Sequence, residues 1–403
     1  MRRERVSDGG LRRVNTDIAV IGGGIMGSAL AYWLTELDRE ARVTVIERDP
    51  SYARASSALS AASIRQQFST AINVRISQQS IEFLRQAGER LGVEGETPDI
   101  GLVEGGYLYL AGAEGMPALR AAHAIQRAEG AAVALLDRAR LGARFPWLAL
   151  DGIEAGSFGE SGEGWFDGYG LLRALARKAR SQGARYLRGE VRGLKVRSHR
   201  LTGLTLADGT HLGCDFAVNA AGPWARAIAA LAGIELPVFA RRRTVFVLSS
   251  PNALPRLPLL IDTSGFWLRP DGRGYIGAPA PGSADDPDEA PLEPELGRFE
   301  TEFWPALAAR IPAFEAARLE RAWAGYYDFN TFDQNGILGM HPSIDNLVFM
   351  NGFSGHGMQQ APVVGRATAE LILTGRYVSL DLAELGIGRL IEDRPLRELN
   401  IIG

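Results

Sequence analysis

A glycine-rich segment near the start of the chain has the residue types and the spacing that bind a diphosphate. Gly22, Gly24 and Gly27 satisfy the pattern G-x-G-x-x-G directly after the apolar, β-branched run 17–21. The first glycine permits a tight turn, the second lets a pyrophosphate approach the backbone, and the third lets a helix pack closely on a strand. A helix that begins here offers free N–H groups and its positive dipole end to the phosphates. The segment therefore predicts a dinucleotide site.

The elements around these glycines complete the expected binding unit. Residues 17–21 predict a strand, residues 28–37 a helix rich in Ala and Leu, and residues 42–46 a second strand. Glu47 follows that strand, twenty residues after Gly27, where its carboxylate can accept hydrogen bonds from ribose hydroxyls and would repel a 2′-phosphate. An α/β turn without a nucleotide is the alternative interpretation. Three further residues of the unit are expected to contact the cofactor: Ile25, Met26 and Arg48.

A second copy of the glycine pattern, at residues 272–277, lacks this setting. Pro270 precedes it and Pro279 follows it, so no helix can begin there. We predict a hairpin turn that enters a strand. The pattern alone is weak evidence, and the first copy counts because strand, helix, second strand and acid are all in place.

Length and composition set the outer bounds. A chain of 403 residues exceeds the size at which one core keeps growing, so two domains are expected. Apolar content is 46% and charged content 23%, as in an ordinary globular protein, and the net charge of −3 gives no reason to expect nucleic acid as a partner. No apolar stretch approaches the ~18 residues that span a bilayer. Residues 1–15 are expected to be a disordered tail, with a weak organelle-targeting segment as the alternative.

Cysteine and histidine usage argues against disulfide and metal chemistry. Cys214 is the only cysteine, so there is no intrachain disulfide, and a cytoplasmic location fits. The five histidines are scattered, and no pair has the spacing of a metal-binding helix, so no metal site is expected.

Periodicity along the chain predicts a nucleotide domain, built from several segments, that is interrupted by a sheet-rich domain. Asp167 is expected to cap a helix that leads into a strand. The acidic, proline-rich residues 281–295 predict a mobile surface loop. Other helices are expected at 71–91, 116–129 and 359–373, an antiparallel meander at 192–212, and strands at 100–110, 215–219, 244–248, 266–268, 275–277 and 347–350.

A second glycine loop lies between the last expected strand and helix. Three glycines within residues 352–357 allow backbone contact with a planar ligand, and the helix that follows aims its positive end at the loop. This arrangement suits the pyrimidine end of a flavin, where negative charge develops on reduction. A purely structural glycine turn is the alternative. The residues expected to contact the ring are Gly352, Phe353, Ser354, Gly355, His356, Gly357 and Met358.

Four motifs, in this order, resemble the D-amino-acid oxidase, glycine oxidase and sarcosine oxidase group of flavoproteins. They are the first glycine unit with Glu47, the small-residue stretch that begins with Ser56 and Ser57, residues 219–224, and residues 352–357. The likeness runs from Asp17 to about Arg376 and implies FAD as the cofactor. It adds four further cofactor-contacting positions: Ala221, Gly222, Trp224 and Gly325.

The resemblance implies an α/β fold (α+β overall), with a Rossmann-like FAD-binding domain and a second, sheet-rich substrate domain. The FAD-binding domain would comprise residues 16–95, 150–235 and 321–376, and the substrate domain residues 96–149 and 236–320. Residues 377–403 would form a C-terminal extension. Residues 323–336 and 355–362 are also similar to a mitochondrial group of FAD-dependent oxidoreductase domain-containing proteins, which is linked to assembly of respiratory complex I. That likeness implies FAD and leaves the reaction open.

Departures from sarcosine oxidase shape the expected chemistry. Its flavin-linking cysteine matches Tyr326 here, and no histidine occurs in residues 51–67, where related dehydrogenases attach the flavin, so FAD should be bound noncovalently. Its oxygen-activating lysine lies in a strand that matches the one around Tyr275, and the loss of that positive charge argues against fast oxidase chemistry. Its carboxylate-binding arginine and lysine match Arg65 and Gln359.

The expected reaction is oxidation of a C–N bond in an amino acid or N-alkylamino acid by hydride transfer to flavin N5, with oxygen, a quinone or an electron carrier as acceptor. Arg65 is the first choice for the substrate carboxylate because a guanidinium makes a two-pronged contact, with a structural arginine as the alternative. Gln359, His356 and Tyr275 are the other candidates for the substrate end, each with plain packing as its alternative. Residues 241–243, three arginines, are interpreted as a solvated face, with an anion gate as the alternative.

Two other classes of function remain open on the sequence. One is a flavin-bearing scaffold that assists assembly of a partner and turns over little. The other is an NAD-dependent dehydrogenase that uses only the first nucleotide unit, and such a protein would be colourless.

Overall fold

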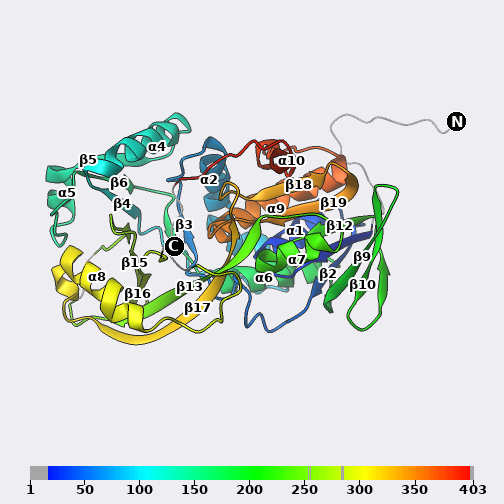
Figure 1. Ribbon diagram of the computed structural model, residues 1–403, viewed down its shortest axis with the longest axis horizontal. Helices are drawn as coiled ribbons and strands as arrows, with labels where there is room; N and C mark the ends of the chain where they lie inside the picture. The colour runs from blue at the N-terminus through cyan, green and yellow to red at the C-terminus, as the bar shows by residue number, and fades with distance from the viewer. Residues whose placement is uncertain (1–16, 253, 255, 283–285, 400–403) are drawn as a thin grey trace.

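The computed structural model describes residues 17–252, 254, 256–282 and 286–399, so the expected tail at 1–15 lies outside it. Two large sheets form the two halves of the molecule, and helix α2 (Ala71–Arg85) lies between them (Figure 1). The α/β fold with a second, sheet-rich part is thereby confirmed.

The six-stranded sheet carries the first glycine unit, and its strand order is β18-β19-β12-β1-β2-β8. All neighbouring pairs are parallel except β18 and β19. Ile18 and Val20 pack on one side of the central strand and Ala19 on the other, because a parallel strand is buried on both faces. The strands are β1 (Asp17–Ile21), β2 (Arg42–Glu47), β8 (Arg185–Arg188), β12 (Phe216–Asn219), β18 (Ile337–His341) and β19 (Ile344–Asn351).

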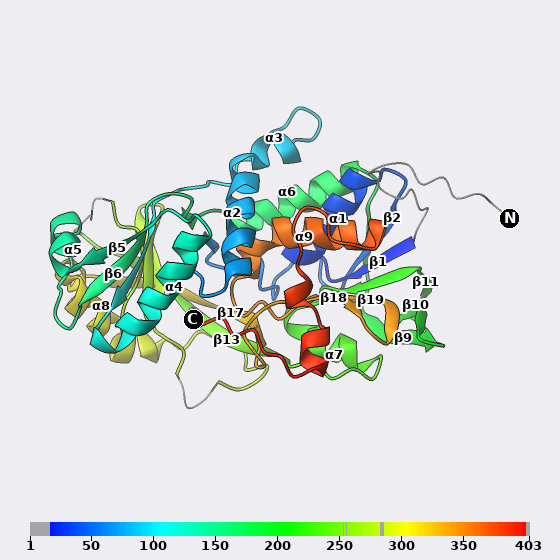
Figure 2. The ribbon, with the colours of Figure 1, turned by 90° about the horizontal axis from the view of Figure 1, so that it is seen from above.

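Helices and a small sheet cover the two faces of this sheet (Figure 2). One face carries α1 (Ile25–Leu37), α6 (Gly168–Ser181) and α9 (Gly357–Thr374). The other face carries α7 (Ala225–Ala230) and the predicted antiparallel meander of β9 (Val191–Arg197), β10 (Arg200–Leu206) and β11 (His211–Gly213). Asp167 caps α6 as expected, since its carboxylate accepts a hydrogen bond from the Gly170 amide at 2.8 Å.

The eight-stranded sheet has the order β17-β13-β16-β15-β14-β4-β6-β5. One of its faces packs an aromatic core against α8 (Trp304–Arg310), and the other turns Tyr107, Val245 and Trp267 toward the six-stranded half. The strands are β4 (Tyr107–Ala111), β5 (Val133–Asp137), β6 (Ala155–Gly159), β13 (Val238–Ser249), β14 (Leu259–Ile261), β15 (Trp267–Asp271), β16 (Gly274–Ala278) and β17 (Arg318–Asn330).

This sheet takes two strands from ranges that the sequence placed in the FAD-binding domain. β6 comes from 150–235 and β17 begins before residue 321, and both are hydrogen-bonded into the second sheet. We keep two domains as a proposal, with β6 and β17 assigned to the substrate domain. The remaining α-helices and strands are α3 (Ala87–Leu91), α4 (Met116–Ala128), α5 (Arg138–Arg144), α10 (Gly388–Ile391), and a two-stranded pair of β3 (Ser63–Ile64) and β7 (Gly164–Trp165).

Two local expectations can be compared directly with the structure. The second G-x-G-x-x-G copy is a hairpin, as predicted, because Asp271 pairs with Gly274 across the turn between β15 and β16. The strand expected over 100–110 was partly wrong: β4 begins only at Tyr107, after Gly106 with its positive φ of 87°. The described part of the acidic loop 281–295 contacts β13 through ion pairs that involve Asp286 and Glu295, and the mobility expected of this loop stays a prediction. Within the described ranges, no helix is both long and apolar enough to cross a bilayer.

Candidate functional site

A cavity of about 1210 Å³ contains both glycine segments in its lining. Both loops follow carboxyl ends of strands in the six-stranded sheet, which is where open α/β sheets bind ligands. The predicted cofactor-contacting residues that line the cavity are Gly22, Gly24, Ile25, Met26, Glu47, Arg48, Ser56, Ser57, Ala221, Gly222, Trp224, Gly325, Phe353, Ser354, Gly355, His356, Gly357 and Met358. Gly27 and Gly352 support the loops from behind and are not part of the lining.

Close backbone contacts explain the glycines of the first loop. A Cβ on Gly27 would lie 2.0 Å from the Gly22 carbonyl oxygen, so only glycine lets α1 begin against this turn. Gly22 itself has φ +103°, and a Cβ there would lie 2.4 Å from the Ala220 carbonyl oxygen. These contacts place the N-terminus of α1 at the cavity, where its first-turn N–H groups have no partner within the helix.

Side chains close this end of the cavity. The Glu47 carboxylate accepts a hydrogen bond from the Gly23 amide at 2.8 Å, which orients it beside the turn. The Ser57 hydroxyl accepts from the Ile25 amide at 2.9 Å and brings the small-residue stretch onto the start of α1. The Ser56 hydroxyl oxygen is buried and has no hydrogen-bond partner among the described residues. It is therefore available to a ligand.

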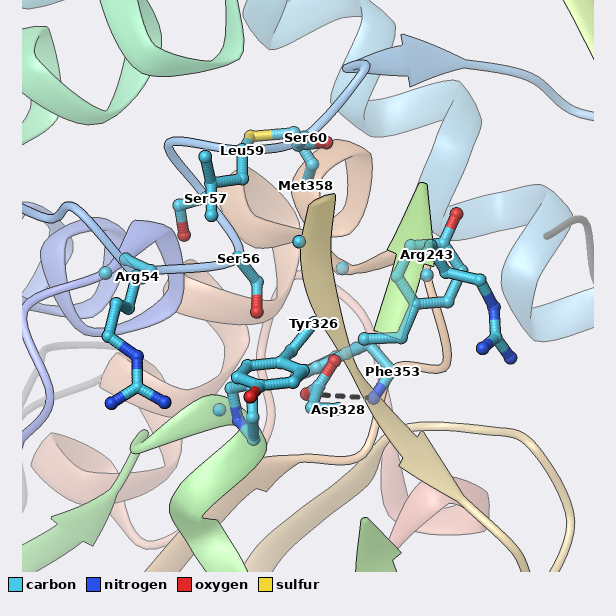
Figure 3. A pocket seen from close by; sticks show the side chains of 18 of the residues that line it. Arg54, Ser56, Ser57, Leu59, Ser60, Arg243, Tyr326, Asp328, Phe353 and Met358 are labelled. Carbon is cyan, nitrogen blue, oxygen red and sulfur yellow. Dashed lines mark hydrogen bonds between the residues drawn. The ribbon is translucent and has the colours of Figure 1, made fainter. Parts of the chain in front are cut away.

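An aromatic and cationic wall lies further along the cavity. The guanidinium carbon of Arg48 is 3.6 Å from the centre of the Trp224 ring. The Tyr326 ring packs edge-on against Trp224, and its hydroxyl donates to the Ala290 carbonyl at 2.6 Å. Figure 3 shows Tyr326 between Arg54 on one side of the view and Arg243 on the other.

Asp328 organises the second glycine loop. Its carboxylate accepts hydrogen bonds from the Gly352 amide at 2.9 Å and from the Phe353 amide at 3.2 Å, and Figure 3 shows the second of these. Burial raises the pKa of this carboxyl to about 6. Gly355 is required for close approach, since a Cβ there would lie 2.3 Å from the Tyr327 ring. The loop thus delivers the N-terminus of α9 to the cavity, and no side chain caps that helix end.

His356 precedes α9 and is 4% exposed. Neither of its ring nitrogens has a hydrogen-bond partner within the described part of the chain. Burial, together with the positive charge of Arg65, lowers the pKa of this imidazole well below its usual range. The side chain is therefore neutral, and it is a free polar group in the cavity lining.

Arg65 and Gln359 meet at one end of the cavity. The Gln359 side-chain oxygen accepts a hydrogen bond from the Arg65 amide at 2.8 Å. The guanidinium of Arg65 donates to the Gln67 carbonyl at 2.8 Å, and its carbon lies 3.9 Å from the centre of the Phe68 ring. Arg65 is only 3% exposed, so the structure places it as a buried cation in the lining and not as a surface arginine.

Two sequence interpretations need correction. Tyr275 does not line the cavity: its ring packs on Phe314 in the aromatic core, because alternate residues of β16 face opposite sides of the sheet, and Ala278 faces the cavity instead. The arginines at 241–243 are not a solvated face. Arg243 is 11% exposed at its side chain, makes a two-pronged contact with Asp286, and lines the cavity together with Arg242.

Sequence reasoning missed several lining residues. Asp328 lies within the stretch 323–336 whose likeness we noted, but its role as an acceptor for the second loop depends on a contact 24 residues away. Arg54 and Tyr107 also line the cavity, and no local pattern marks either of them. The one sequence signal that could have indicated Asp328 is the presence of an aspartate inside a strand-forming run.

The lining fits a molecule with a diphosphate and a planar ring. One helix N-terminus faces each glycine loop, Glu47 stands beside the first loop, and unpartnered polar atoms of Ser56 and His356 face the space between them. These donors and acceptors match an extended dinucleotide better than a small isolated substrate.

Comparison with known proteins identifies the family. Residues 17–371 match the family described as FAD dependent oxidoreductase. The chain is 41% identical to FAD-dependent oxidoreductase domain-containing protein 1 of Xenopus laevis over 98% of this chain and 86% of that protein. It is 27% identical to L-proline dehydrogenase from P. horikoshii, with a TM-score of 0.83 over 94% of this chain and 99% of that one. Glycine oxidase from Geobacillus kaustophilus shares the fold at 24% identity, with a TM-score of 0.77 over 92% and 98% of the two chains.

The fold and the cavity are those of a two-sheet, dinucleotide-binding oxidoreductase. The chain belongs to the family of FAD-dependent oxidoreductases.

Glu163 supports the segment that carries Arg65. It is 1% exposed and accepts hydrogen bonds from the Gln66 amide at 2.6 Å and the Gln67 side-chain amide at 2.7 Å. Burial raises the pKa of this carboxyl from 4.5 to about 7. A raised carboxyl pKa contributes stability that is fully present below pH 4.5 and is lost as the pH rises through about 7.

We therefore predict that Glu163→Gln flattens the pH dependence of the free energy of unfolding. Between pH 5 and pH 8, which brackets the raised pKa, wild type should lose more stability than the variant, because only wild type must ionise a buried carboxyl. Urea denaturation across this range measures the difference. Glu160→Gln, at an exposed glutamate nearby, is the control and should follow wild type. Parallel curves for Glu163→Gln and wild type would contradict the assignment.

Proposed function

We propose that this protein oxidises a C–N bond of an amino acid or N-alkylamino acid with noncovalently bound FAD, and that it works as a dehydrogenase more than as an oxidase. The observation that carries the proposal is one cavity lined by both glycine loops, with the buried cation Arg65 among its walls. The diphosphate would lie at Gly24 and the start of α1, and the flavin ring beside residues 352–358. When bound, FAD would supply the hydride acceptor at flavin N5.

The charge of Arg65 indicates which kind of substrate would bind at this end of the cavity. A buried guanidinium is matched best by a carboxylate, to which it can donate two parallel hydrogen bonds. The neutral ring of His356 would offer a nitrogen to the substrate amine without placing a second positive charge beside it. The side-chain amide of Gln359 would orient the same substrate. Glycine oxidase and L-proline dehydrogenase, the two enzymes matched above, act by name on amino acids, which supports this class of substrate.

The absence of a lysine from the described lining supports a dehydrogenase. The chain has two lysines, Lys178 and Lys195, and neither is among the cavity residues. The negative charge of Glu398 also acts on Arg65, which reduces the net positive charge that would favour reduced oxygen species. A quinone or an electron carrier would then accept the electrons faster than oxygen.

The side chains at the expected attachment point support noncovalent binding. Tyr326, where sarcosine oxidase has its cysteine, donates its hydroxyl to a backbone carbonyl. Cys214 is not among the described residues that line the cavity.

Amino-acid oxidation predicts that the purified protein is yellow and that a substrate bleaches it without oxygen. A screen of D-amino, L-amino and N-methyl amino acids, followed by visible absorbance under anaerobic conditions, should find one class that reduces the flavin. An artificial dye should then be reduced faster than peroxide is released. Loss of colour on purification even with added FAD would contradict the proposal, and a yellow protein that no amine bleaches would favour a scaffold.

The mode of flavin attachment has a direct test. Acid precipitation should leave all of the flavin in the supernatant, because no side chain is bonded to it. Flavin that stays with the precipitated chain, seen as a mass increase of the intact protein, would contradict noncovalent binding.

Arg65→Ala should raise the half-saturating concentration of a carboxylate-bearing substrate by about 30-fold or more, since truncating one partner of a buried charge pair costs about 2–5 kcal/mol. Arg65→Lys should recover only part of this loss, because an ammonium lacks the two-pronged geometry. Arg39→Ala, at an exposed arginine, is the matched control. Steady-state kinetics with a reducible dye measures all three, and unchanged half-saturation in Arg65→Ala would remove Arg65 from the substrate site.

A further inference from the structure

The C-terminal segment after α10, residues 392–399, returns to the region between the two sheets. Figures 1 and 2 show this red trace leaving α10 and running toward α2. Glu398 is fully buried, although the segment has little regular structure and exposes Leu399. A glutamate is expensive to bury unless its charge is paired or hydrogen-bonded.

Asp333 holds this segment in place. Its carboxylate forms a buried, two-pronged ion pair with Arg389 of α10, with N–O distances of 2.7 and 2.9 Å, and it accepts a hydrogen bond from the Leu396 amide at 2.9 Å. Asn335 donates from its side chain to the Leu396 carbonyl at 2.7 Å. Asp333 and Asn335 belong to residues 323–336, the stretch whose sequence likeness we noted, and in the structure they bind the C-terminal segment.

The buried carboxylate of Glu398 meets four donors at the start of α2. One oxygen accepts from the Ser69 amide at 2.7 Å and the Ser69 hydroxyl at 2.6 Å. The other accepts from the Thr70 hydroxyl at 2.9 Å and the Asn73 side-chain amide at 3.0 Å. The Leu399 amide also donates to the Ser69 hydroxyl at 2.8 Å, so both Glu398 and Leu399 of the segment bind Ser69.

Ser69 directly follows Phe68, whose ring packs against the side chains at the substrate end. The Phe68 ring lies under the Arg65 guanidinium at 3.9 Å and beside the His356 ring, with 5.3 Å between the two ring centres. The charge of Glu398 also acts on both Arg65 and His356. Hydrogen bonds that hold Ser69 in place therefore also hold the neighbouring Phe68 ring, which packs against the Arg65 guanidinium.

We propose that Glu398 is a positioning residue of the substrate end: the C-terminal segment, held by Asp333, carries it to Ser69, and it thereby holds Phe68 and the Arg65 guanidinium in the orientation that accepts a carboxylate. This inference rests on the proposed role of Arg65. It gives residues 392–399 a function in substrate recognition, far in sequence from either glycine loop.

The test is carboxylate selectivity in the FAD-loaded protein, measured by calorimetric titration with benzoate and with benzamide, its neutral counterpart of the same shape. Glu398→Ala removes the acceptor of all four hydrogen bonds and should weaken benzoate binding by at least about tenfold while benzamide binding changes little. Glu398→Gln keeps an acceptor oxygen and should recover most of the benzoate affinity. Rescue by Gln separates positioning from charge, because both variants remove the negative charge.

Controls keep the outcome decisive. If Glu398→Ala does not fold, Ser69→Ala serves as the second variant. It removes the hydroxyl that donates to Glu398 and leaves the other three donors, so it should weaken benzoate binding in the same direction by a smaller factor. Glu392→Ala, at an exposed glutamate of the same segment, should bind benzoate as wild type does.

Tighter benzoate binding in both Glu398 variants would show that charge alone matters and would overturn the proposal. Wild-type affinity in Glu398→Ala, with the loss confined to Arg65→Ala, would overturn this inference alone. Benzoate binding that Arg65→Ala does not weaken would overturn the Arg65 assignment as well.

Discussion

The contact between Gly27 and the carbonyl of Gly22 is the constraint on which the site depends. With only 2.0 Å between that oxygen and the position of a Cβ, no other residue lets α1 begin directly above the end of β1. The parallel pairing of β1 with β2 and β12 then sets Glu47 and the turn after Asn219 on either side of the helix start. The anion-binding end of the cavity is thus a consequence of backbone geometry, and side chains add to it.

The rest of the site is held by buried carboxylates that accept several hydrogen bonds each. Asp328 fixes the second glycine loop, Glu163 fixes the segment after Arg65, and Glu398 fixes the start of α2. A loop of small residues has little packing of its own, so an acceptor that binds two or more of its N–H groups replaces the missing contacts. Burial raises the pKa of Asp328 and Glu163, which shows that desolvation outweighs their hydrogen bonds.

Local patterns were sufficient where the function is local. The strand, glycine turn, helix and Glu47 are contiguous, and the structure has them in the expected order, with the helix beginning three residues earlier than expected, at Ile25. The hairpin at residues 272–274 is also present. The prediction that Tyr275 lines the site was wrong because a shift of one residue along a strand moves a side chain to the other face of the sheet. Burial of Arg243 depends on Asp286, and Glu398 reaches Ser69 across 329 residues of sequence. No periodicity or motif reports such pairings. The sequence could therefore indicate the cofactor and candidates for the substrate end such as Arg65, but not the buried carboxylates Glu163 and Glu398 that support that end.

The central claim is that both glycine loops hold one extended FAD. A crystal structure of the FAD-loaded protein tests it most directly. The account predicts the diphosphate against the Gly24 amide and the start of α1, and the flavin ring against residues 355–358 in the same cavity. A flavin ring bound away from residues 355–358, or a diphosphate remote from the start of α1, would contradict it.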